Sequence, residues 1–153
     1  MRHYVCGAIV VAASLLVGPA QAADAIFTGT ITSTCLLTVG TPGVLTAPNA
    51  VSLSSKNAGG QFSTVAVVTT GGVSLSVNPT VAETIRPAGD TGTILWTPTF
   101  AVVGSHPSAD SGASRSLTSA GIDTMNVNLE GVKQNGGAFA AGAYTSTVTV
   151  TCQ

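Results

Sequence analysis

The residues that could do chemistry in this 153-residue chain are few and scattered. Charged residues make up only 7% of the sequence, and most fall in predicted turns, where we expect them to be solvated. Beyond the first 22 residues one histidine remains, and a Ser-His-Asp arrangement around His106 has to recruit Asp110 or Asp123 and one of many serines. Neither a Gly-x-Ser-x-Gly elbow nor a pair of carboxylates supports catalysis. We therefore interpret His106 as an exposed loop residue and expect that the protein is not an enzyme.

The same composition argues against metals, cofactors and nucleic acid. Cys35 and Cys152 have no neighbouring His or Cys that could complete a metal site. No phosphate-binding glycine loop precedes a helix. A formal net charge of −1 leaves no basic surface for nucleic-acid phosphates. We expect no metal, no cofactor and no nucleic-acid partner.

The first 22 residues have the organisation of a secretory signal peptide. Arg2 precedes an apolar stretch at residues 4–17, and small residues at 20–22 provide a cleavage signature. A membrane anchor is the alternative, but the apolar stretch is short for a bilayer. We expect cleavage before Ala23 and export of the mature chain.

Two cysteines, Cys35 and Cys152, remain in the mature chain. In an oxidising compartment such a pair usually forms a disulfide. This bridge closes a loop of over 100 residues, and loop-closure entropy gives it roughly 4–5 kcal/mol of stabilisation. Two free buried thiols are the alternative.

The composition and the periodicity of the mature chain predict an all-β fold. The 15 Ser, 22 Thr and 18 Gly of the whole 153-residue chain contrast with very few Lys and Glu, the residues that favour helices. Strand candidates with two-residue alternation or β-rich composition lie at residues 51–53, 62–70, 73–78, 93–103 (interrupted by Pro98), 125–130 and 144–152. We expect a hairpin at residues 70–73, a long exposed loop at 105–119, and about seven strands in a two-sheet sandwich.

At both ends of the mature chain, the residues show the two-residue alternation of a strand. The last run carries on one face Tyr144, Ser146, Val148, Val150 and Cys152. At the start, Phe27, Gly29 and Ile31 lie on one face of a predicted strand. As an internal strand the glycine would only weaken it. As a strand added to another sheet, Phe27 and Ile31 fill pockets and Gly29 permits close approach.

These two termini resemble one family of secreted proteins. Phe27-x-Gly29, followed by alternating residues up to Cys35, resembles the N-terminal extension of chaperone–usher pilins. Residues 141–153 are similar to the final pilin strand, and also to the spore-coat-U-like, archaic branch of these sandwiches. Together the motifs cover about 25 residues.

The resemblance implies an immunoglobulin-like β-sandwich that is incomplete and is completed by a donor strand. It divides the chain into a signal peptide (residues 1–22), a donor-strand extension (23–34) and a sandwich domain (35–153). The donor-strand residues it assigns are Phe27, Gly29 and Ile31. The residues it places at the edge of the acceptor groove, in contact with a chaperone, are Tyr144, Val148 and Val150.

The function that the resemblance implies is that of a structural fimbrial (pilus) subunit, which polymerises by donor-strand exchange after chaperone-assisted folding in the periplasm. The fimbrium stands on the cell surface and supports cell adhesion. The implied partners are identical or related subunits, a periplasmic chaperone, an outer-membrane usher and a host or surface receptor. We favour a shaft subunit over a tip adhesin, since one domain leaves no separate receptor-binding module and Trp96 is expected in the core. The alternative is a self-complete secreted sandwich that acts as a surface coat or binding protein.

The sequence departs from the family pattern in two respects. The family places its second cysteine inside the sandwich, whereas residues 36–151 contain none. Cys35 and Cys152 both fall on core-directed faces, so a bridge between them is geometrically reasonable and ties the start of the sandwich to its last strand. The extension is also short, with about eight residues before Thr32.

Overall fold

The structure, a computed structural model, describes residues 26–153. The expected signal peptide and its cleavage site before Ala23 lie outside these residues. The chain divides into two units, one ending at Thr30 and one running from Ile31 to Gln153. The described part of the first unit, residues 26–30, has no helix or strand.

The second unit is built from β-strands alone, so the all-β prediction is confirmed. In chain order the strands are β1 (Cys35–Val39), β2 (Ser52–Ser54), β3 (Ser63–Thr69), β4 (Val73–Val77), β5 (Ala82–Ile85), β6 (Ile94–Gly104), β7 (Ser108–Ser111), β8 (Arg115–Leu117), β9 (Gly121–Lys133), β10 (Thr145–Thr147) and β11 (Val150–Cys152). Among residues 26–153, no helix has the length and apolar character needed to cross a membrane.

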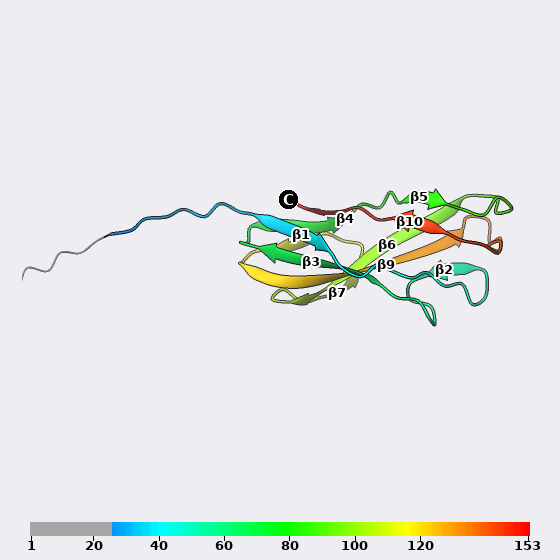
Figure 1. Cartoon of the computed structure of the whole chain (residues 1–153), viewed down its shortest axis with the longest axis horizontal. Coiled ribbons are helices and arrows are strands. Elements are labelled where there is room, and N and C mark those ends of the chain that lie inside the picture. Colours follow the sequence, from blue (N-terminus) through cyan, green and yellow to red (C-terminus); the bar gives the residue numbers. More distant parts are fainter. Residues whose placement is uncertain (1–25) are drawn as a thin grey trace, which may run out of the picture. The chain divides into compact units, whose positions relative to one another are not determined.

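The strands form antiparallel sheets that pack as a sandwich (Figure 1). One layer has the order β1-β3-β9-β6-β7, with β2 also paired to β9. The other layer pairs β10 with β5, and β11 with β4 and β8. A backbone hydrogen bond of 2.8 Å from Asn78 to Thr149 continues the pairing between these two stretches. Such breaks within one long pairing are part of the reason that eleven strands are found where about seven were expected.

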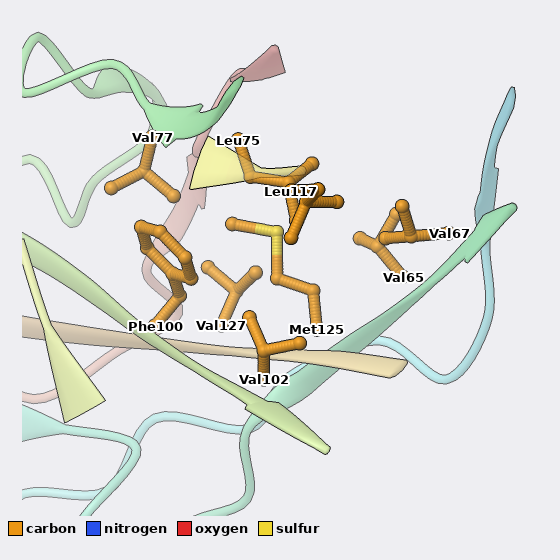
Figure 2. Close-up of a cluster of buried hydrophobic side chains, with 9 residues drawn as sticks. All are labelled: Val65, Val67, Leu75, Val77, Phe100, Val102, Leu117, Met125 and Val127. Carbon is orange, nitrogen blue, oxygen red and sulfur yellow. The ribbon is translucent and has the colours of Figure 1, made fainter. Parts of the chain in front are cut away.

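The core lies between the two layers (Figure 2). It consists of nine buried side chains from both layers, namely Val65, Val67, Leu75, Val77, Phe100, Val102, Leu117, Met125 and Val127. Alternation along β9 places Met125 and Val127 inward, and each such side chain contributes about 1.5–3 kcal/mol when buried. A second cluster joins Leu53, Ile94 and Phe139, and the partly buried Trp96 packs against it.

The turn at residues 70–73 differs from the expected hairpin. Gly71 and Gly72 have φ values of 90° and 72°, the positive φ that the two glycines were expected to supply. However, β3 and β4 belong to different layers, so this turn carries the chain across the sandwich. The hairpin prediction is wrong because a tight glycine turn does not reveal which sheet receives the next strand.

The prediction of a long loop at residues 105–119 is also wrong, because this segment contains β7 and β8. Leu117 in β8 is fully buried, although serine is the most frequent residue in this segment. Strand β6 runs through Pro98 without interruption. One edge of β6 pairs with β9 along its whole length, but the other edge pairs with β7 only from Phe100 onward. Pro98 has no N–H to donate, and at this second edge no strand is paired to it that would need one.

Candidate functional site

A groove of about 850 Å³ runs between β1 and the segment that carries β10 and β11. In the sheet order, β1 is the outer strand of its layer, and β10 and β11 are outer strands of the opposite layer. An outer strand presents a row of unpaired backbone N–H and C=O groups. Both rims of this groove are therefore able to pair with an added strand.

The lining of the groove is largely apolar. Its hydrophobic residues from β1, β2, β3 and β9 are Leu37, Val39, Leu53, Val65, Val127 and Leu129. The lining residues, all between 37 and 150, include no charged side chain. Burial of apolar surface of this kind away from water is favourable in free energy. The groove thus suits an extended, uncharged segment with alternating apolar side chains.

The structure places the expected rim residues Tyr144, Val148 and Val150 along this groove. Side chains at every second position from 144 to 152 are partly buried, and the threonines between them are exposed. Ser146 also lines the groove, and its Oγ atom is buried without a hydrogen-bond partner. A buried hydroxyl without a partner costs stability until a partner is supplied.

The expected donor residues are exposed. Phe27, in the unit that ends at Thr30, is 93% exposed, and a Cβ added at Gly29 would meet no atom within 4 Å. Ile31, at the start of the second unit, is 83% exposed and does not line the groove. Residues 26–34 form no strand, although the alternation predicted one. Within residues 26–153, the first strand begins at Cys35.

The predicted disulfide between Cys35 and Cys152 is present, with the two Cα atoms 6.2 Å apart. Cys35 begins β1 and Cys152 ends β11, so the bond ties the two rims of the groove together at one end. Toward Tyr144 the rims have no covalent link among the described residues.

A buried ionic network holds the Tyr144 end of the groove. The side chain of Asp90 has no exposed surface, and its carboxylate accepts hydrogen bonds from Arg86 Nη2 at 2.7 Å and from the Ala140 backbone N–H at 3.0 Å. Lys133 Nζ and the Tyr144 hydroxyl contact the same carboxylate. The expectation that charged residues are solvated is wrong for Asp90 and Lys133, which are both buried. No local pattern around either residue indicates that the two would pair.

His106 also lies in a polar cluster and is not the exposed loop residue that we expected. Its Nδ1 is 2.7 Å from Asp123 Oδ2, and its Nε2 is 3.0 Å from Ser119 Oγ. The side chains of His106 and Asp123 are 10% and 0% exposed. The other candidate, Asp110, instead forms an ion pair of 2.5 Å with Lys56. The pairing of β6 with β9 brings the cluster together, and short-range sequence patterns do not reveal it.

Among residues 26–153, no three His, Cys, Asp or Glu side chains gather where they could hold a metal ion. Comparison of the chain with known protein families, with curated proteins and with solved structures finds no match.

Proposed function

We propose that the protein is a structural fimbrial subunit in which residues 23–34 of one copy fill the groove of the next. The observation that carries this proposal is the apolar groove between two outer strands, β1 on one side and β10 and β11 on the other. A chaperone in the periplasm fills the groove before assembly, because an exposed groove with unpaired edges promotes aggregation. An outer-membrane usher then exports the subunits to the cell surface, where the fimbrium supports adhesion to a receptor.

The strand order supports an immunoglobulin-like sandwich that lacks its final strand. The order β1-β3-β9-β6 corresponds to the A-B-E-D sheet of such domains. The opposite sheet of those domains contains strands C, F and G, and here β4 and β5 take the place of C while β10 and β11 take that of F. The position of strand G, beside β10 and β11, coincides with the groove.

The spacing of the extension fits that position. In an extended strand, side chains on one face repeat about every 6.6–6.8 Å. Phe27, Gly29 and Ile31 follow this repeat, as do the rim residues Val148 and Val150. Transfer of Phe27 and Ile31 from their exposed positions into the groove would contribute about 1.5–3 kcal/mol for each side chain. Because each copy offers one extension and one groove, growth is head-to-tail and open-ended.

The decisive experiment removes residues 23–30 and supplies a synthetic peptide of residues 23–34. We expect the truncated protein to bind the peptide, to melt at a higher temperature with it and to form no polymers. If the protein is instead a self-complete coat or binding module, the truncation unfolds the domain, or leaves a stable monomer that does not bind the peptide. Either of these results would overturn the proposal.

A matched peptide tests the role of Gly29. A peptide with Gly29→Leu keeps the length and the apolar character, but it adds a side chain where close approach is required. We expect it to bind far more weakly than the native peptide, and the same change in the full chain to block polymerisation. Normal filaments from the Gly29→Leu protein would contradict the assignment of Gly29 to the donor strand.

A further inference from the structure

We propose that Ser119 is a base-activated nucleophile, with His106 as its general base and Asp123 as a positioning residue, and that it accepts acyl groups from small activated esters. His106, Ser119 and Asp123 do not line the groove, and their chemistry is independent of the fimbrial role.

The three side chains form a continuous hydrogen-bonded chain. Ser119 Oγ is 3.0 Å from His106 Nε2, and His106 Nδ1 is 2.7 Å from Asp123 Oδ2. A nucleophile within hydrogen-bond reach of a base, which a third group orients, is the structural signature of an activated serine. This signature depends on geometry and not on the position of the residues in the sequence.

The carboxylate of Asp123 fixes the direction of the hydrogen bonds around His106. This carboxylate has no exposed surface and can only accept hydrogen bonds. Oδ1 accepts the backbone N–H of His106 at 2.7 Å, and Oδ2 faces Nδ1 of the same residue. The neutral imidazole therefore carries its proton on Nδ1 and directs the Nε2 lone pair at Ser119. In this state the Ser119 hydroxyl donates to Nε2, as base catalysis requires.

Three glycines leave room for the cluster. A Cβ at Gly104 would lie 2.8 Å from Asp123 Oδ1, and one at Gly121 would lie 2.6 Å from His106 Cε1. A Cβ at Gly71 would lie 2.7 Å from the carbonyl carbon of Ser119. A side chain at any of the three would displace one member of the cluster. Glycine at these three positions thus leaves space for Asp123, His106 and Ser119.

The exposure of the cluster determines the class of substrate. Ser119 is exposed while His106 is largely buried behind it, so an acyl donor reaches the hydroxyl directly from solvent. In the reaction, Ser119 Oγ bonds to the ester carbonyl carbon, the bond to the leaving-group oxygen breaks, and the Ser119 proton passes through Nε2 to that oxygen. Water then hydrolyses the acyl-serine by the same base. We therefore expect the substrate to be an ester with a good leaving group, because the site supplies a base next to an exposed hydroxyl.

The test treats the purified protein with p-nitrophenyl acetate, follows release of p-nitrophenolate and locates the acetyl group by peptide mass analysis. We expect the adduct on Ser119 among the 15 serines of the chain. Ser119→Ala should abolish this adduct, and His106→Ala should slow its formation by about 10²–10⁴-fold, the usual contribution of a general base. Acetylation spread over several serines, or an undiminished rate in His106→Ala, would overturn the proposal.

Ser105→Ala is the matched control, because Ser105 Oγ lies in the same corner but bonds to the Ile122 backbone and not to a histidine. It should acetylate at the wild-type rate. Asp123→Asn tests the positioning role, since an amide can hold the imidazole in the wrong tautomer. A folded Asp123→Asn protein, verified by circular dichroism, should lose most of the rate; an unchanged rate excludes that role. If the buried substitutions prevent folding, the comparison of Ser119→Ala with Ser105→Ala still decides whether Ser119 is the nucleophile.

Discussion

Cys35 and Cys152 join the first strand of the sandwich to its last strand, and they do so at one end of the groove. The bond crosses from one layer to the other, because β1 and β11 are outer strands of opposite layers. It therefore fixes the separation of the two rims at that end. At the Tyr144 end, the ionic network around Asp90 restrains one rim by noncovalent contacts.

Replacing both cysteines, Cys35→Ala with Cys152→Ala, should destabilise the domain strongly. The two residues are 117 apart in sequence, and a loop of that length corresponds to roughly 4–5 kcal/mol of loop-closure entropy. Urea denaturation of the double variant and of the reduced wild-type protein measures the effect. The two should lose a similar free energy of unfolding, and a loss below about 1 kcal/mol in both would contradict this account.

Asp90→Ala should cost far more stability than Asp110→Ala. Removing Asp90 leaves the largely buried Lys133 without its carboxylate partner, and such a loss typically costs about 3–5 kcal/mol. Asp110 pairs with the exposed Lys56, and an exposed pair contributes about 0–1 kcal/mol. Chemical denaturation of the two variants gives the comparison. Equal losses would show that the Asp90 network contributes no more than a surface pair.

Much of the sandwich could be predicted because alternation directly reflects burial on one face of a strand. The alternation at residues 73–78 predicted a strand, and β4 spans Val73–Val77. Residues 144–152 were expected to alternate between inward and outward faces, and they do so in the structure. The pairing of Cys35 with Cys152 followed from counting cysteines. Each of these inferences depends on local spacing or on composition.

The polar clusters could not be predicted because they depend on which strands become neighbours. His106 and Asp123 are 17 residues apart and meet through the pairing of β6 with β9. Asp90 and Lys133 are 43 apart, and nothing near either residue indicates burial. The short strand β8 was missed for a related reason: the residues Arg115–Leu117 lie in a serine-rich segment without clear alternation, and they form a strand through their pairing with β4.

Gly131→Ala should disturb the only tryptophan in the chain. A Cβ at Gly131 would lie 2.5 Å from Trp96 Cζ3, so the indole ring must move. We expect a loss of about 1–3 kcal/mol, the usual cost of overpacking, together with a change in tryptophan fluorescence. Gly89→Ala is the control, because a Cβ at Gly89 meets no atom within 4 Å. A stable Gly131→Ala protein with native fluorescence would contradict the packing.

Asp110 should contribute a small part of the acid sensitivity of the fold. Burial raises the pKa of this carboxyl, but hydrogen bonds from Lys56 and Thr99 and the charge of Lys56 outweigh it, so its pKa lies below the ordinary 3.8. The unfolded chain therefore binds more protons than the folded one just below pH 3.8, and stability falls as the pH decreases through that window. Thermal unfolding between neutral pH and acid should show a shallower loss for Asp110→Asn than for wild type. Parallel curves would exclude the contribution of Asp110.

Replacing Val148 should weaken binding of the peptide, whereas replacing its neighbour Thr149 should leave binding unchanged. Val148 lines the groove and Thr149 is exposed on the opposite face of the same segment. Val148→Thr keeps the shape but places a hydroxyl against apolar surface, which costs about 1–3 kcal/mol when no partner is available. Titration calorimetry with the peptide of residues 23–34 should therefore show at least about fivefold weaker binding to Val148→Thr. Thr149→Val is the matched control and should bind as wild type does. Equal weakening by both changes would mean that the peptide does not lie against the inward face of this rim.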